Sequence, residues 1–138
     1  MIRQLSIFAE NKQGAMNRIT QILQDNGINM NTLVTNDSAE FGIIRMLVSD
    51  TEKASEALKE AGYMCHSDRV AAVEIDDACG SLNRLLGVIS GGNINLDYIY
   101  VTYNSLSRLP VAILKCQDLP EVESFLRGRG YRTLERID

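Results

Sequence analysis

The first half of the chain changes its hydrophobic period in an order that predicts strands and helices in turn. Apolar residues at alternate positions from Ile2 to Ala9 are typical of a half-buried strand. From Gly14 the apolar residues recur at helical spacing, and Asn26-Gly27 is a stop signal, which predicts a helix between them. Two stretches rich in Ile, Val, Leu and Thr follow, Ile28–Asn36 and Phe41–Ser49, and the polar Asn36-Asp37-Ser38 between them predicts a hairpin turn.

A second helix and a last strand complete this half. Asp50 or Thr51 is suited to cap a helix that ends at Gly62, and a strand is expected to start at Tyr63. The predicted order is therefore β-α-β-β-α-β. This is the ferredoxin-like unit, an α+β arrangement in which an antiparallel sheet carries both helices on one face.

The same pattern occurs twice along the chain. A shift of 66 residues superimposes the first parts of the two copies, and the shift becomes 68 past their middle, which implies two residues inserted in a hairpin loop of the second copy. The matched pairs include Gly14 and Gly80, Arg18 and Arg84, Asn29 and Asn95, and Gly62 and Gly130. We predict two tandem ferredoxin-like units, residues 1–67 and 68–138. Because about 70 residues form a thin core, we expect the copies to pack together and the chain to form a homodimer.

Composition narrows the function classes. With 45% hydrophobic and 23% charged residues, the 138-residue chain is typical of a globular protein, and no apolar stretch approaches the ~18 residues of a transmembrane helix. The net charge of −4, with no run of like charges, argues against a nucleic-acid partner. The start of the chain lacks the apolar core of a signal peptide, so we expect a cytoplasmic protein without a membrane partner.

The three cysteines, Cys65, Cys79 and Cys116, form no Cys-x-x-Cys pair. This spacing favours buried thiols, and we expect no metal or cofactor.

Candidate chemistry lies at the turns that precede the first helix of each copy. A glycine there, Gly14 or Gly80, leaves backbone N–H groups free at the positive end of the helix dipole, which suits a carboxylate. Fifteen residues beyond each glycine, an asparagine, Asn29 or Asn95, interrupts an apolar stretch and offers a donor and an acceptor. A plain turn glycine and a backbone-bonded asparagine are the structural alternatives. The coincidence of both features in both copies favours ligand binding.

These residues resemble a known family of domains. The segment from Glu10 to Met16, Glu-Asn-Lys-Gln-Gly-Ala-Met, followed by Gly27-Ile-Asn-Met30, is similar to the ACT domain, a small-molecule regulatory module of amino-acid metabolism with the usual pattern Asn-x-Pro-Gly-x-Leu and then Gly-Ile-Asn-Ile. The resemblance covers the whole chain as two copies. It implies paired β-α-β-β-α-β units that bind an amino acid between the first loop of one unit and the second strand of its neighbour.

Carried over residue by residue, the resemblance implies two sites. One joins Asn11, Gly14, Ala15 and Met16 to Asn95 and Leu96, and the other joins Asp77, Gly80, Ser81 and Leu82 to Asn29 and Met30. The methionine and leucine residues near both loops favour an apolar or medium-sized amino acid as the ligand.

The sequence departs from the family pattern at three positions. Gln13 and Cys79 stand where the family usually has proline, so the loops are expected to be less rigid. Asp77 replaces the asparagine found at Asn11, and a carboxylate is an acceptor only. We therefore expect the two sites to differ in affinity.

Three function classes are compatible with this topology. The preferred one is a stand-alone amino-acid sensor or regulatory subunit, without catalytic activity, that acts on a partner enzyme of amino-acid metabolism. The alternative is a small acylphosphatase-like enzyme, which Gln13-Gly14 with Arg18 superficially fits; that family places its arginine three residues after the glycine, whereas here the gap is four. An RNA-recognition domain is weakest, because it needs basic charge and aromatic residues on central strands. His66, the only histidine, has no pattern that ties it to a nucleophile.

Overall fold

The computed structural model describes residues 1–10, 12–35 and 41–137, and these residues form two compact units. The N-terminal unit contains Arg3–Asp68. The C-terminal unit contains Arg69–Asp138 together with Met1–Ile2 at the start of the chain.

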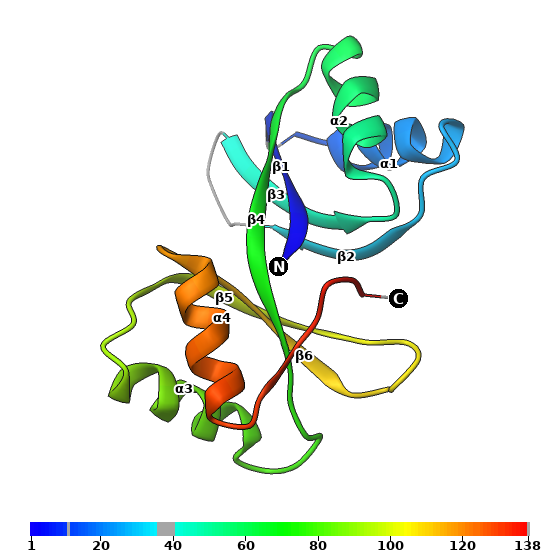
Figure 1. Cartoon of the computed structure of the whole chain (residues 1–138). Coiled ribbons are helices and arrows are strands. Elements are labelled where there is room, and N and C mark those ends of the chain that lie inside the picture. The colour runs from blue at the N-terminus through cyan, green and yellow to red at the C-terminus, as the bar shows by residue number, and fades with distance from the viewer. Residues whose placement is uncertain (11, 36–40, 138) are drawn as a thin grey trace. The chain divides into compact units, whose positions relative to one another are not determined.

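The N-terminal unit is a four-stranded sheet with two helices. Its elements are β1 (Ile2–Glu10), α1 (Ala15–Asp25), β2 (Met30–Thr35), β3 (Phe41–Val48), α2 (Thr51–Glu60) and the first part of β4 (Met64–Glu74). The strand order is β2-β3-β1-β4, and β3 pairs antiparallel with both β1 and β2 (Figure 1). Leu5, Ile7 and Met46 of the strands pack with Ile19 of α1 and Leu58 of α2 in one buried cluster. One face of the sheet and both helices therefore share a core.

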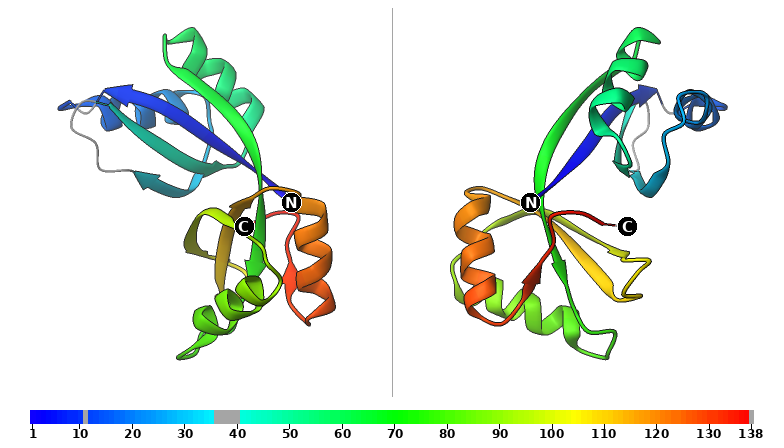
Figure 2. Two further views of the ribbon diagram at one scale, coloured as in Figure 1. Left: turned by 90° about the vertical axis from the view of Figure 1, so that its left-hand side faces the viewer. Right: turned by 45° about the vertical axis from the view of Figure 1, so that its right-hand side comes forward.

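The C-terminal unit repeats this arrangement. Its elements are the rest of β4, α3 (Ser81–Gly91), β5 (Leu96–Tyr103), β6 (Pro110–Cys116), α4 (Leu119–Gly128) and the short β7 (Arg132–Thr133). The strand order is β7-β4-β6-β5, with antiparallel pairing (Figure 2). Val73 and Leu114 of the strands pack with Leu85 of α3 and Leu126 of α4. The predicted α+β fold of two tandem ferredoxin-like units is confirmed.

Strand β4 belongs to both units. Its 11 residues run without a break. Its first part is the last strand of the N-terminal unit, and its second part is the first strand of the 69–138 segment of the C-terminal unit. The sequence between Met64 and Glu74 contains no glycine or proline that would turn the chain. The last strand of one copy and the first strand of the next are therefore one continuous strand.

Turn chemistry sets the ends of the helices. The Asp50 side chain accepts a hydrogen bond from the Lys53 backbone N–H at 3.0 Å, which makes Asp50, rather than Thr51, the N-cap of α2. Helix α1 ends where Gly27 takes a left-handed conformation, as the predicted stop signal requires. The predicted hairpin turn at 36–38 lies outside the described residues.

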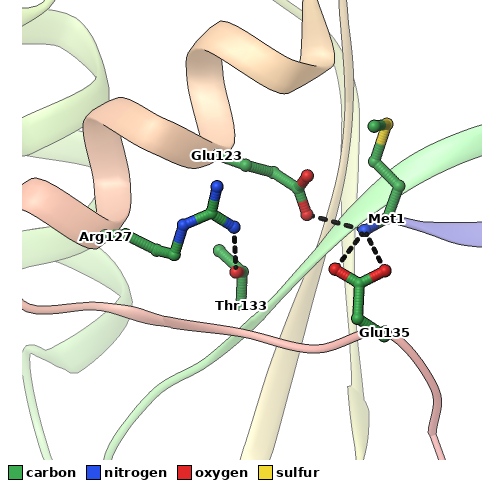
Figure 3. A network of polar contacts seen from close by, with 5 residues as sticks. All are labelled: Met1, Glu123, Arg127, Thr133 and Glu135. Carbon is green, nitrogen blue, oxygen red and sulfur yellow. Dashed lines mark hydrogen bonds and ion pairs between the residues drawn. The ribbon is translucent and has the colours of Figure 1, made fainter.

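A polar network holds the end of the C-terminal unit to α4 (Figure 3). The α-ammonium group of Met1 lies 2.7 Å from the carboxylate of Glu123, whose side chain is only 5% exposed, and 3.3 Å from that of Glu135. The Arg127 guanidinium donates to the Thr133 hydroxyl at 2.9 Å. Glu123 is thus a buried charge that is stabilised by an opposite charge.

Candidate functional site: two helix starts without a side-chain cap

Helices α1 and α3 begin in the same way. Each follows a glycine in the left-handed region, Gly14 with φ of 85° and Gly80 with φ of 87°. The glycine carbonyl accepts the first helical hydrogen bond. Its donor is the backbone N–H of Arg18 at 3.0 Å in α1 and the backbone N–H of Arg84 at 2.9 Å in α3. Neither glycine has a side chain to cap the helix, in contrast to Asp50 of α2. The N–H groups of Ala15 and Ser81 donate to the carbonyls of Lys12 and Ala78 at 3.3 and 3.2 Å. The next N–H groups of the first turn are directed out of the positive end of the helix dipole, where they suit an anion such as a carboxylate.

The space around the two glycines differs. A Cβ atom added to Gly14 would meet nothing within 4 Å, whereas one added to Gly80 would lie 3.5 Å from Nη1 of Arg84. Glu10 and Lys12 form an exposed ion pair at 3.2 Å in the first loop, and Asn11 lies outside the described residues. The second loop carries the exposed Asp77. The first loop is thus sterically open, and the second has a guanidinium beside it.

The two matched arginines take different directions. Nη2 of Arg84 donates to the Ser81 hydroxyl at 3.2 Å, which places its charge at the start of α3. Nη2 of Arg18 instead donates to the Ala61 carbonyl at 3.4 Å, and its guanidinium lies 5.4 Å from the centre of the Tyr63 ring. Arg18 therefore contacts the end of α2 and not the loop at Gly14, which argues against a phosphate cradle of the acylphosphatase kind.

The predicted asparagines lie at the other end of the same helices. Asn29 and Asn95 precede β2 and β5, and both are exposed. The backbone N–H of Asn29 donates to the Ser49 hydroxyl at 3.0 Å, while no hydrogen bond joins the side-chain amide of Asn29 or Asn95 to another described residue. Both amides are therefore available to a ligand.

Within one unit the two halves of the predicted site do not meet. Helix α3 has 11 residues and separates Gly80 from Asn95 by about 16 Å at 1.5 Å per residue. Helix α1 separates Gly14 from Asn29 in the same way. The hydrophobic residues of the predicted sites lie close to these two ends. At the helix starts, Ala15 and Met16 are half-buried and Leu82 is 36% exposed. At the strand starts, Met30 and Leu96 are half-buried.

Each asparagine lines a cavity that sequence reasoning did not identify. The one at Asn29 measures about 420 Å³ and includes Gln24 and Met30. The one at Asn95 measures about 360 Å³ and includes Asp118 and Phe125 of the β6–α4 region. The two segments that contribute to the second cavity are at least 20 positions apart in sequence, and no motif marked the β6–α4 segment.

Two expectations about reactive side chains have different outcomes. Cys65 and Cys116 are buried as expected, but the expectation is wrong for Cys79, which is exposed because it lies in the loop before Gly80 and not in a core strand. His66 lies in β4, is exposed and contacts the Asp68 carboxylate at 3.2 Å.

In the described part of the chain, no helix is both long and apolar enough to cross a membrane. Among the same residues, no group of three or more His, Cys, Asp or Glu side chains is arranged to hold a metal ion.

Comparison with known proteins adds a family and several similar folds. The profile of a family described as ACT domain pair matches residues 1–115. A search of the curated proteins gives no match. Among solved structures, a protein of Bacteroides thetaiotaomicron is 28% identical, with a TM-score of 0.88 over 96% of this chain and 91% of that one.

Two regulatory subunits of aspartate kinase share the fold. The subunit from Thermus thermophilus, in its ligand-free form, is 15% identical, with a TM-score of 0.68 over 93% of this chain and 90% of that one. The subunit from Thermus flavus is also 15% identical, with a TM-score of 0.66 over 91% of this chain and 88% of that one. At this identity the likeness concerns the fold alone.

Proposed function

Because the chain belongs to the ACT domain family, as a pair of such domains, we propose that it is a regulatory protein that binds a small amino acid and has no catalytic activity of its own. The observation that carries the proposal is the repeated helix start, where a left-handed glycine leaves the first N–H groups of α1 and α3 without a side-chain cap. A ligand carboxylate fits this environment, since it can accept those hydrogen bonds at the positive end of the helix dipole.

The amino group of the ligand requires an acceptor, which the exposed asparagine amides can supply. Since Asn29 and Asn95 lie a helix length away from the glycine of their own unit, we propose that each site is completed by a neighbouring ACT unit, as the family resemblance implies. The residues proposed to contact ligand are Asn11, Gly14, Ala15, Met16, Asp77, Gly80, Ser81, Leu82 and the strand-start residues Asn29, Met30, Asn95, Leu96.

The two sites are proposed to have different affinities. The helix start at Gly80 has the Arg84 guanidinium beside it, which favours a carboxylate, and the exposed Asp77 nearby disfavours one. The start at Gly14 lacks the arginine, because Arg18 contacts Ala61 instead. Calorimetry that resolves two classes of site would support this, and two equal, independent sites per chain would contradict it.

Regulation is proposed to follow from a population shift. A ligand that binds one arrangement of the units more tightly than another stabilises that arrangement by its differential affinity. The output would be a change in a homodimer or in a partner enzyme of amino-acid metabolism in the cytoplasm. The two aspartate kinase regulatory subunits are consistent with such a role for this fold.

A thermal-shift screen of the twenty amino acids tests the proposal. A ligand at 100 times its dissociation constant adds about 2.7 kcal/mol to the free energy of unfolding. We expect one or a few amino acids to raise Tm, and Asn29→Ala and Asn95→Ala to reduce that increase while leaving the Tm without ligand unchanged within about 2 °C. If both variants keep the full response, the site assignment is wrong. If no amino acid raises Tm, the proposed function is wrong.

A further inference from the structure

We propose that the cavity beside Asn95 in the C-terminal unit binds a small organic cation, namely a primary ammonium group on an aliphatic chain. The cavity of about 360 Å³ lies between the end of α3, the start of β5 and the β6–α4 turn. Apart from Asn95, none of its lining residues belongs to the proposed amino-acid sites, so the inference goes beyond that function.

The inner wall of the cavity is apolar and closely packed. Val122 is 4% exposed, and the Phe125 ring is half-buried. A Cβ atom added to Gly92 would lie 2.6 Å from Cζ of Phe125, so only a glycine at this position lets the ring lie against the end of α3. Ile94 extends the same wall. An aliphatic chain of four or five carbons would cover this surface and remove it from water.

The rim of the cavity is acidic. Asp97 from β5 and Asp118 and Glu121 from the β6–α4 segment contribute three carboxyl groups, and no lysine, arginine or histidine is among the described residues that line it. The amides of Asn93, Asn95 and Gln117 add hydrogen-bond acceptors, which suit the three donors of an ammonium group.

An ammonium group fits this rim better than a metal ion does. No three described carboxyl, thiol or imidazole groups converge closely enough to hold a metal, and divalent cations require a compact shell of oxygen ligands. A carboxylate rim around an apolar wall instead matches a molecule with a charged end and an aliphatic body.

The electrostatics of the rim support a cationic ligand. A hydrogen bond that the protonated Glu121 carboxyl group donates to Asp118, together with the repulsion between the two negative charges, raises the pKa of Glu121. Burial raises the pKa of the Cys116 thiol, the Asp97 carboxylate adds to that increase, and the Lys115 ammonium group opposes it. An ammonium group between the carboxylates would relieve their repulsion and allow all of them to be charged.

The N-terminal unit lacks this chemistry at the matched positions and serves as an internal control. Asn31 stands where Asp97 is, Lys53 where Glu121 is, and Ala57 where Phe125 is. Asp50, which matches Asp118, is engaged as the N-cap of α2. We therefore expect a single cation site per chain.

Isothermal titration calorimetry of the full chain with 1,5-diaminopentane tests the proposal, with 1,5-pentanediol as its uncharged match and MgCl2 as a metal probe. We expect the diamine to bind, the diol to bind at least tenfold more weakly, and 0.5 M NaCl to weaken diamine binding. Asp97→Asn with Glu121→Gln should weaken amine binding at least tenfold. Glu52→Gln, an exposed carboxylate of the N-terminal unit, is the matched control and should leave it unchanged.

The outcomes separate this inference from the proposed function. Amine binding that Asp97→Asn with Glu121→Gln does not alter, equal binding of 1,5-diaminopentane and 1,5-pentanediol, or a Mg²⁺ affinity that depends on these carboxylates would overturn the inference. Amine binding that survives in a chain with no thermal response to any neutral amino acid would leave the inference standing and contradict the proposed amino-acid sites. A urea midpoint of the double variant close to that of the original chain shows that it is folded.

Discussion

Replacement of Gly80 by alanine measures how far the start of α3 depends on a left-handed residue. The glycine has a φ of 87°, where an L side chain costs roughly 1–2 kcal/mol. The added Cβ would lie 3.5 Å from Arg84 Nη1, which is an ordinary contact, so steric repulsion adds little. Alanine also reduces the conformational freedom of the unfolded chain, which recovers about 0.4–1 kcal/mol. The net expectation is a loss of about 1 kcal/mol in the free energy of unfolding.

Gly87→Ala is the matched control. Gly87 lies within α3, is exposed, and would place its new Cβ atom in open space. Because alanine is the better helix former, this change should stabilise the protein by about 0.5–1 kcal/mol. The free energy of unfolding of Gly80→Asn should lie between that of the original chain and that of Gly80→Ala, because asparagine tolerates the left-handed region.

Urea denaturation distinguishes these variants. With a slope of about 2 kcal/mol per molar urea, Gly80→Ala should lower the midpoint by roughly 0.5 M and Gly87→Ala should raise it by a similar or smaller amount. A Gly80→Ala midpoint equal to that of the original chain, or a lower midpoint for Gly87→Ala than for Gly80→Ala, would refute the argument that a left-handed conformation defines the helix start.

Three further predictions concern other contacts. Asp50→Ala removes the hydrogen bond from the Lys53 N–H and should lower the free energy of unfolding by about 1 kcal/mol, whereas Asp50→Asn should lose little; urea midpoints decide this. Glu123→Ala removes the buried partner of the chain's α-ammonium group and should cost about 1–3 kcal/mol, more than Glu135→Ala, whose carboxylate is exposed; equal losses would contradict the burial argument. In the native protein at pH 8, Cys79 should react rapidly with a disulfide reagent and Cys116 slowly, because burial raises the pKa of the Cys116 thiol; mass spectrometry of the modified peptides gives the order.

The fold could be predicted from the sequence because each element has a local signal. The alternation at the start of the chain, the helical spacing after Gly14 and the stop at Asn26-Gly27 each follow from the geometry of one element, and the repeat at 66 residues doubles every signal. The continuity of β4 was less evident. This continuity depends on backbone hydrogen bonds that join β4 to β1 and to β6. The alternation of side chains along one strand does not reveal which strands pair with it.

The candidate site could be predicted only in part. The left-handed glycines are local features, whereas the direction of an arginine depends on its neighbours. Ala61, which receives the Arg18 guanidinium, corresponds to Arg129 in the second copy, and that residue lies 4.9 Å from the centre of the Phe125 ring. A like charge at this position disfavours the same contact for Arg84, which turns to the helix start instead. Two arginines that the repeat aligns thus make different contacts.

The cavity beside Asn95 has no sequence signature. Asp97 follows α3, while Asp118 and Glu121 follow β6, and only the pairing of β5 with β6 brings these segments together. No spacing along the chain encodes that pairing.

Backbone amide mapping by NMR tests the central claim most directly. The ¹⁵N-labelled chain is titrated with the amino acid that gives the largest thermal shift, and the amide signals are followed residue by residue. The account predicts the largest changes at residues 14–16 and 80–82 and in the side-chain amides of Asn29 and Asn95, where the ligand carboxylate and ammonium groups would bind. Saturable changes confined to other parts of the units, with these signals unmoved, would contradict it.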